Sequence, residues 1–264
     1  MISLFNHSEP LAIMPSGIPK LDASLSDMRH ISASRSLVNI EDGLAIIKLH
    51  GPIMRTAAGY ARQFLDEVGL SYVISPETAD AITEAANNPG VRAIVIDVDS
   101  PGGQVNGTPE LADAVRAAAS LKPCYAYTAG LCASAAYWVA SQCDAIYNAP
   151  SAYVGSIGVL CVLEDYTDAA KQKGIKYNII QAGKYKTAGA AVKPLTDDER
   201  DLFQMQVDNI FAQFKSCVNS RRSLSDDVMQ GQVFYGTEAV ENGLTDATCN
   251  SLREFCAKSR RRHC

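Results

Sequence analysis

The sequence of 264 residues predicts an α/β domain in which helices connect the strands of a parallel β-sheet, with a helical region toward the C-terminus. Three observations support this fold class. Apolar runs of strand length alternate with segments of helical periodicity. Runs such as residues 91–98 are rich in β-branched residues and lack polar alternation, which is typical of strands buried on both faces. Glycine-rich loops follow several of the runs.

Turn and cap signals indicate where the expected strands and helices begin and end. His50-Gly51-Pro52 closes the first strand, and Asn88-Pro89-Gly90 ends a helix that Ser75 is expected to cap. A tight turn at Gly130 should lead into a helix that begins at Ser134. The expected strands are residues 43–49, 91–98, 124–127, 144–147 and 177–181. Helices should begin near residues 75, 108, 134 and 165. Residues 55–71 should form a loop or a short helix.

The C-terminal third is expected to be mainly helical. Thr196-Asp197-Asp198-Glu199 is a capping box, which predicts the start of a long helix. Shorter helices should follow near Ser225 and at residues 237–242. We therefore expect an N-terminal arm at residues 1–42, one domain at residues 43–248 and a basic tail at residues 249–264.

Composition excludes several classes of function. The net charge of −5 implies no general attraction to nucleic acid, and the basic run at residues 260–263 is local. No apolar run approaches the ~18 residues of a membrane span, and the N-terminus lacks a signal-peptide pattern, so a cytoplasmic protein is expected. The eight cysteines form no CxxC pair, so the spacing of a metal site is absent. No metal or cofactor is expected.

Ser134 is the first candidate for chemistry. It lies between small residues in Cys132-Ala133-Ser134-Ala135-Ala136, where a strand is expected to meet a helix. Free backbone N–H groups at such a junction stabilise negative charge, which acyl transfer needs. The alternative is an ordinary helix cap, because serine is among the commonest N-cap residues.

A nucleophilic serine needs a base that takes its proton. Of the four histidines, only His50 follows an expected strand, and there it more readily fills a turn. A neutral lysine can do the same work. Lys184 and Lys186, in the loop Gly183-Lys184-Tyr185-Lys186, point to the same side of an extended segment, so the pattern alone leaves both open.

An oxyanion needs backbone donors. Gly102 and Gly103 follow a buried strand and have no side chains, so their N–H groups could face a substrate. The N–H group of Ala135, just after the serine, is a third candidate by analogy with other acyl-transfer sites. The alternative for Pro101-Gly102-Gly103 is a simple tight turn.

Taken together, these motifs resemble the S49 peptidases, which include signal peptide peptidase A and the phage head-maturation proteases. The resemblance rests on Asp99 to Gly103, on Ser134-Ala135-Ala136-Tyr137-Trp138, on Gly155-Ser156-Ile157-Gly158 and on Gly183 to Lys186, and it covers about residues 43–246. It implies a ClpP/crotonase-like fold. Ser134-Ala135-Ala136-Tyr137 is similar to the phage and prophage branch.

The resemblance also implies roles for individual residues. Ser134 matches the nucleophile and Lys186 the general base, while Gly102, Gly103 and Ala135 match the oxyanion hole. Gly155, Ser156, Ile157 and Gly158 match the loop that shapes the substrate cleft. The resemblance implies a homo-oligomer, in which neighbouring subunits can share the Ser-Lys dyad. It also implies capsid maturation, in which scaffold, portal or the protease itself is processed in the host cytoplasm or the procapsid.

Other functions stay open. One is a peptide-degrading enzyme similar to the signal peptide peptidases. A second is an acyl-CoA enzyme of the crotonase type, which would bind CoA and use carboxylates. A third is a catalytically idle assembly protein that keeps the fold as an oligomeric module. Cleavage of peptides, and its loss on removal of Ser134, would separate these possibilities.

Overall fold

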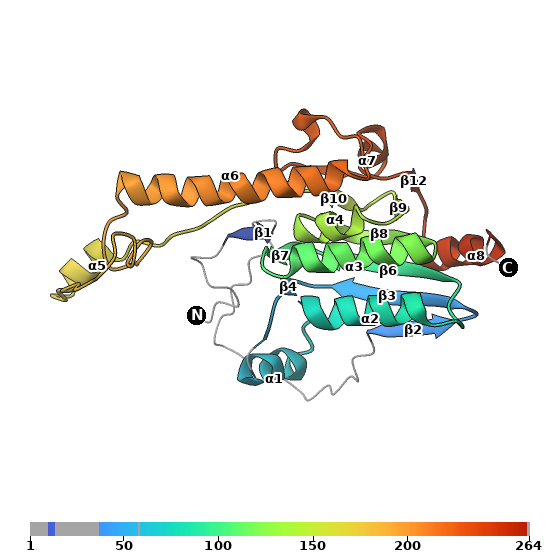
Figure 1. Cartoon of the computed structure of the whole chain (residues 1–264), viewed down its shortest axis with the longest axis horizontal. Coiled ribbons are helices and arrows are strands. Elements are labelled where there is room, and N and C mark those ends of the chain that lie inside the picture. The colour runs from blue at the N-terminus through green and yellow to red at the C-terminus, as the bar shows by residue number, and fades with distance from the viewer. Residues whose placement is uncertain (1–9, 14–36, 58, 263–264) are drawn as a thin grey trace.

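The computed structural model describes residues 10–13, 37–57 and 59–262 (Figure 1). Its centre is an eight-stranded sheet with the order β11-β10-β8-β6-β3-β2, in which β9 also pairs with β8 and β12 pairs with β9. Neighbouring strands among β3, β6, β8, β9, β10 and β12 are parallel to one another. The edge strands are antiparallel to their neighbours, β2 to β3 and β11 to β10. The strands are β2 (Val38–Glu41), β3 (Leu44–His50), β6 (Ala93–Ser100), β8 (Cys124–Ala133), β9 (Ala145–Asn148), β10 (Tyr153–Gly155), β11 (Val233–Tyr235) and β12 (Ala247–Thr248). The predicted α/β class with a parallel core is confirmed.

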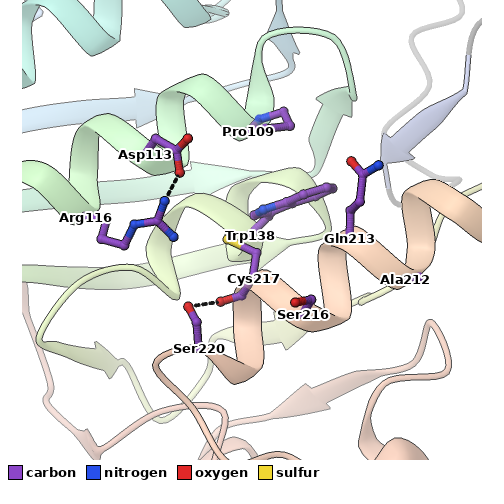
Figure 2. Close-up of a pocket in the computed structure, with 9 residues that line it drawn as sticks. All are labelled: Pro109, Asp113, Arg116, Trp138, Ala212, Gln213, Ser216, Cys217 and Ser220. Carbon is purple, nitrogen blue, oxygen red and sulfur yellow. Dashed lines mark hydrogen bonds and ion pairs between the residues drawn. The ribbon is translucent and has the colours of Figure 1, made fainter.

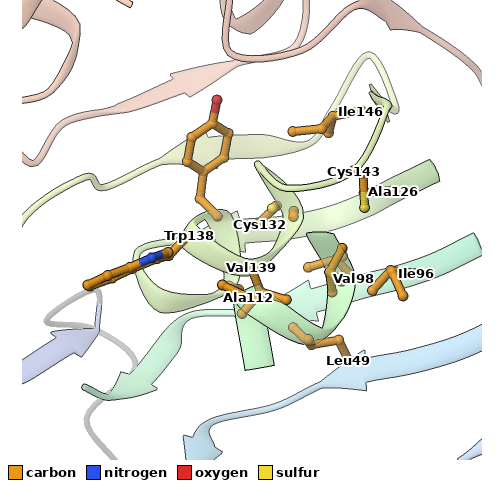
Figure 3. Close-up of a cluster of buried hydrophobic side chains, with 14 of the residues drawn as sticks. Leu49, Ile96, Val98, Ala112, Ala126, Cys132, Trp138, Val139, Cys143 and Ile146 are labelled. Carbon is orange, nitrogen blue, oxygen red and sulfur yellow. The ribbon is translucent and has the colours of Figure 1, made fainter. Parts of the chain in front are cut away.

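Helices cover both faces of this sheet. On one face lie α2 (Ser75–Asn87), α3 (Thr108–Leu121) and α4 (Ala135–Ala140) (Figure 1). Between them and the strands lies the main core, where residues such as Leu49, Ile96 and Val139 are fully buried (Figure 3). On the other face, α8 (Leu252–Arg262) packs Phe255 against the rings of Tyr127 and Tyr147. The predicted tail therefore contains a helix that helps to cover the sheet.

A second, smaller sheet lies next to the first. Its order is β1-β7-β4-β5, made from β1 (Leu11–Ile13), β7 (Gly102–Gln104), β4 (Ile53–Met54) and β5 (Val73–Ile74). The helix α1 (Gly59–Glu67) connects β4 to β5, where the sequence left a loop or a short helix open. The strand β1 comes from the predicted N-terminal arm, most of which lies outside the described residues.

The C-terminal third is dominated by the 23-residue helix α6 (Asp197–Asn219). The predicted capping box is confirmed, since Thr196 Oγ1 accepts from the Glu199 N–H group and the Glu199 carboxylate accepts from the Thr196 N–H group. Phe214 stacks on Trp138 of α4 with ring centroids 4.4 Å apart. Near Ser225 the chain forms only a 3-10 turn, Asp226–Val228, and α7 (Thr237–Glu241) lies between β11 and β12.

Residues 162–195 form a projecting segment, which extends from the body of the protein and carries the short helix α5 (Thr167–Gln172) (Figure 1). The predicted strand at residues 177–181 is wrong, because this stretch has no regular secondary structure. Its apolar side chains face solvent instead of a neighbouring strand, and Ile180 is 98% exposed. None of the helices in the described ranges is both long and apolar enough to cross a bilayer.

The predicted turn at Gly130 is also wrong, since β8 continues to Ala133. Glycine is needed there for close packing: a Cβ atom on Gly130 would lie 2.7 Å from Oδ1 of Asp99. The same Asp99 oxygen accepts a hydrogen bond from the Leu131 N–H group at 3.2 Å. Ser75, which the sequence predicted as the cap of this helix, is instead the first residue of α2, and the cap position is held by Ile74.

Candidate active site

Ser134 lies between the end of β8 and the start of α4. Its backbone has φ 55° and ψ −122°, a left-handed conformation that costs a non-glycine residue about 1–3 kcal/mol. The Ser134 side chain makes no helix-capping hydrogen bond, which argues against the cap alternative, and the residue is 1% exposed. A strained serine between a strand and a helix is the arrangement that presents the nucleophile in α/β-hydrolases.

The loop after β10 encloses this serine. Gly155 pairs with Ala133 in the parallel β8–β10 ladder, and its carbonyl oxygen accepts from the Ser134 N–H group at 2.8 Å. The Ser134 hydroxyl donates a long hydrogen bond, 3.5 Å, to the Gly158 carbonyl oxygen. Ser156 has φ 53°, is buried and donates its N–H group to Gln232. Ile157 is fully buried, so the loop Gly155–Gly158 is fixed against Ser134 on several sides.

The two glycines after β6 have different environments. A Cβ atom on Gly102 would lie 2.8 Å from the Ala135 nitrogen and 2.9 Å from Ser134 Cβ, and Gly102 has φ 97°. A Cβ atom on Gly103 would lie 1.9 Å from the carbonyl oxygen of Ile53. Gly102 therefore lies beside the predicted nucleophile and its neighbour Ala135. At position 103 a glycine is needed because β4 approaches the backbone closely.

Ser100 is a residue that the sequence did not indicate. It is fully buried, and its hydroxyl oxygen accepts from the Gly102 N–H group at 3.2 Å. This contact orients the peptide group of Gly102 beside Ser134. To donate to an oxyanion, the Gly102 N–H group would have to divide its hydrogen bond between Ser100 Oγ and the oxyanion, or exchange Ser100 Oγ for the oxyanion. A serine in an Asp-Ser-Pro-Gly loop carries no sequence signal for such a role.

The two candidate lysines differ. Lys184 Nζ lies 2.5 Å from Oδ2 of Asp198, and this hydrogen bond raises the pKa of the Lys184 amine. A raised pKa favours the charged amine, which cannot accept a proton. Lys186 is exposed in a turn closed by its N–H group and the Gly183 carbonyl. Both lysines belong to the projecting segment.

One chain does not bring Lys186 to Ser134. The hydrogen-bond partners recorded for Ser134, within the described ranges, are Gly155, Gly158 and Trp138. His50, the histidine considered as a base, pairs instead with Asp97, with Nε2 to Oδ2 at 2.9 Å. Among the described residues of one chain, Ser134 is therefore surrounded by its glycine loops and has no hydrogen bond to a basic side chain.

The pocket in Figure 2 lies elsewhere. It has a volume of about 530 Å³ and is bounded by α3, α4 and α6. Trp138, the Asp113–Arg116 ion pair and Cys217 line it, and neither Ser134 nor Lys186 is among the lining residues. This pocket is therefore separate from the surroundings of Ser134.

Comparison with known proteins defines the class of this protein as a peptidase. The family model for peptidase family S49 matches residues 116–257, which is more than half of the chain and includes Ser134, Gly155 to Gly158 and Lys186. The chain belongs to peptidase family S49.

Several curated relatives are proteases. A putative protease of Methanocaldococcus jannaschii is 35% identical over 160 residues, which are 59% of this chain and 51% of the relative. Capsid assembly protease C of Escherichia phage lambda is 29% identical and covers 80% of this chain and 48% of its own length. Protease 4 of Salmonella typhi is 29% identical over 64% of this chain and 28% of its length. The chain spans about half the length of the first two relatives.

Solved structures align at low identity. A probable enoyl-CoA hydratase/isomerase from Mycobacterium abscessus is 14% identical, with 86% of this chain and 75% of that chain covered and a TM-score of 0.45. A membrane-bound stomatin-specific protease is 18% identical, with 81% and 79% covered and a TM-score of 0.40.

Proposed function

We propose that this protein is a serine endopeptidase in which Ser134 is the nucleophile and Lys186 of a neighbouring subunit is the general base. The neutral lysine amine takes the hydroxyl proton as the serine oxygen attacks a peptide carbonyl. The tetrahedral intermediate collapses, and the protonated lysine gives its proton to the leaving amine. Water then hydrolyses the acyl-enzyme by the same route.

The strained backbone of Ser134 is the observation that carries this proposal. Its φ of 55° is unfavourable for serine, yet the side chain makes no capping bond that would explain its retention. The closeness of Gly102 to Ser134 and to the Ala135 nitrogen supports the N–H groups of Gly102 and Ala135 as oxyanion donors, with Gly103 beside them on β7. The loop Gly155–Gly158 would form another wall of the substrate cleft.

The position of Lys186 supports a site shared between subunits. Lys186 belongs to the projecting segment, which carries exposed apolar side chains, namely Tyr166, Ile175, Tyr177, Ile179 and Ile180. Burial of these side chains against a second copy is favourable by about 25 cal/mol per Å². Contact with apolar groups would also lower the pKa of a lysine amine, because desolvation disfavours its charged form.

The relatives suggest a biological setting. Because capsid assembly protease C of phage lambda covers 80% of this chain, we infer that this protein acts in capsid maturation. Its substrates would be scaffold or portal proteins or the protease itself, in the host cytoplasm or the procapsid.

A peptidase assay tests the enzyme proposal. The purified protein is incubated with a denatured peptide library, and cleavage is followed by mass spectrometry. Ser134→Ala and Lys186→Ala should each abolish cleavage, whereas Lys184→Ala, the control in the same loop, should retain most of it. Cleavage that survives Ser134→Ala would exclude Ser134 as the nucleophile. Absence of cleavage in every oligomeric state would favour the idle assembly protein.

A further inference from the structure

The strand β1 pairs with backbone on both of its edges. On one edge it is antiparallel to β7, with Ala12 opposite Gly103 and Ile13 opposite Gly102. On the other edge, the Leu11 N–H group donates to the Leu160 carbonyl oxygen at 2.8 Å, and the Leu160 N–H group donates back at 2.9 Å. The three residues of β1 thus fill the gap between β7 and Leu160, which follows the Gly155–Gly158 loop.

The side chains of β1 are as buried as core residues. Leu11 and Ile13 point into a small apolar cluster with Met54, Tyr72 and partly buried Leu160. Ala12 points the opposite way, is 0% exposed and belongs to the main core. The gap therefore accepts an extended chain with a small residue between two large aliphatic residues.

This gap leads directly to the predicted nucleophile. A Cβ atom on Gly102 would lie 2.2 Å from the Ala12 carbonyl oxygen, 2.8 Å from the Ala135 nitrogen and 2.9 Å from Ser134 Cβ. A carbonyl group of β1 thus lies in the immediate surroundings of both candidate oxyanion donors. An extended peptide that presents its carbonyl carbon to Ser134 would need the same β7 edge.

We propose that residues 11–13 are a tethered occupant of the substrate cleft and must leave it before a peptide substrate can bind. The preferred substrate has the same chemistry, an extended segment with a small residue between two large aliphatic residues. Only one strand can pair with β7 and Leu160 at a time, so β1 and substrate compete. The assignment of the cleft to substrate rests on the proposed function, whereas the competition is measurable without catalysis.

Peptide binding to the full-length Ser134→Ala protein tests the competition, because no cleavage is involved. The probe is a fluorescein-labelled peptide with the sequence of residues 8–16, followed by fluorescence anisotropy. The double variant Leu11→Asp/Ile13→Asp places carboxylates in the apolar cluster and should release β1. We expect it to bind the probe at least about tenfold more tightly than the parent, because the apparent affinity is the intrinsic affinity multiplied by the fraction of molecules in which the cleft is open.

A control variant, a second β1 variant and a control probe complete the test. Leu121→Asp, on the exposed end of α3, adds a charge far from β1 and should bind the probe as weakly as the parent. Ala12→Leu expels β1 by bulk instead of charge, so it should reproduce the tighter binding if the double variant does not fold. A probe in which the residue corresponding to Ala12 is aspartate should lose binding. Equal affinity of the parent and both β1 variants would overturn the proposal, whether or not the wild-type protein cleaves peptides.

Discussion

The backbone turns sharply at Ser134 because β8 ends at Ala133 and α4 begins at Ala135. The turn places the side chain under the Gly155–Gly158 loop and leaves the Ala135 N–H group close to Gly102. Small side chains on both sides make this possible, since Ala133, Ala135 and Ala136 are all fully buried. At the scale of the residue, the proposed role of Ser134 as nucleophile depends on a strained backbone, and the surrounding packing maintains this strain.

Gly102→Ala should disable the site. The added methyl group would lie 2.2 Å from the Ala12 carbonyl oxygen, 2.8 Å from the Ala135 nitrogen and 2.9 Å from Ser134 Cβ, so the Gly102 backbone would have to shift, and we expect kcat to fall about 10²–10³-fold, the loss typical of a lost oxyanion donor. Steady-state peptide hydrolysis measures this. Gly231→Ala is the matched control, because Gly231 also has a positive φ but nothing lies within 4 Å of its Cβ position. A similar loss of kcat in both variants would show that backbone strain, and not crowding at Ser134, is responsible.

The residues that lie around Ser134 could be predicted because each belongs to a short motif of small residues or glycines. Ser100 and Leu160 could not, since their contributions depend on which backbone groups meet across the fold. The strand β1 was missed for a related reason: Leu-Ala-Ile is too short to stand out within a segment of mixed composition. Its partner β7 begins at the glycines that the sequence assigned to the oxyanion hole.

At the scale of elements, the junction between the projecting segment and α6 is held by charge as well as by the cap. Lys193 Nζ lies 2.6 Å from both carboxylate oxygens of Glu199. This ion pair, together with the Thr196 N–H group, holds the pKa of Glu199 below its usual value. The junction fixes where the segment that carries Lys186 leaves the body of the protein.

Glu199→Gln should lower thermal stability at pH 7 and change it little in acid. A carboxyl group with a depressed pKa in the folded state contributes stability above its unfolded pKa of about 4.3, and this contribution is lost as pH falls through the folded value. Circular dichroism melts at pH 7 and at about pH 2.5 give the comparison. Asp197→Asn removes a carboxylate from the same first turn and serves as the control. A difference between wild type and Glu199→Gln that persists in acid would contradict the role of the ion pair.

Most elements of the body were predictable, because buried parallel strands and capped helices leave strong local patterns. The stretch at residues 177–181 was not, although its apolar residues match a strand. An isolated apolar run forms a strand only when another strand pairs with it, and no strand in the described part of the chain pairs with the projecting segment. Local pattern alone could not reveal that these side chains face outward.

At the scale of the whole molecule, the contrast between a well-packed body and an apolar projecting segment points to self-association. If the projecting segment forms the subunit contact of the proposed homo-oligomer, Ile180→Asp should reduce that oligomer to smaller species, since Ile180 is 98% exposed in one chain and a buried charge at an interface is costly. Light scattering coupled to size exclusion measures the mass. Leu121→Asp, on the body, should leave the mass unchanged. An unchanged mass for Ile180→Asp would exclude this part of the segment from the interface.

The sharing of the dyad is tested most directly by mixing two inactive proteins. Ser134→Ala and Lys186→Ala subunits are unfolded together, refolded at equal amounts and assayed for peptide cleavage, with each variant refolded alone as the control. If each site takes its serine from one subunit and its lysine from the next, random assembly should restore about a quarter of wild-type activity. A mixture as inactive as its components, in oligomers shown to contain both variants, would contradict the shared Ser134–Lys186 site.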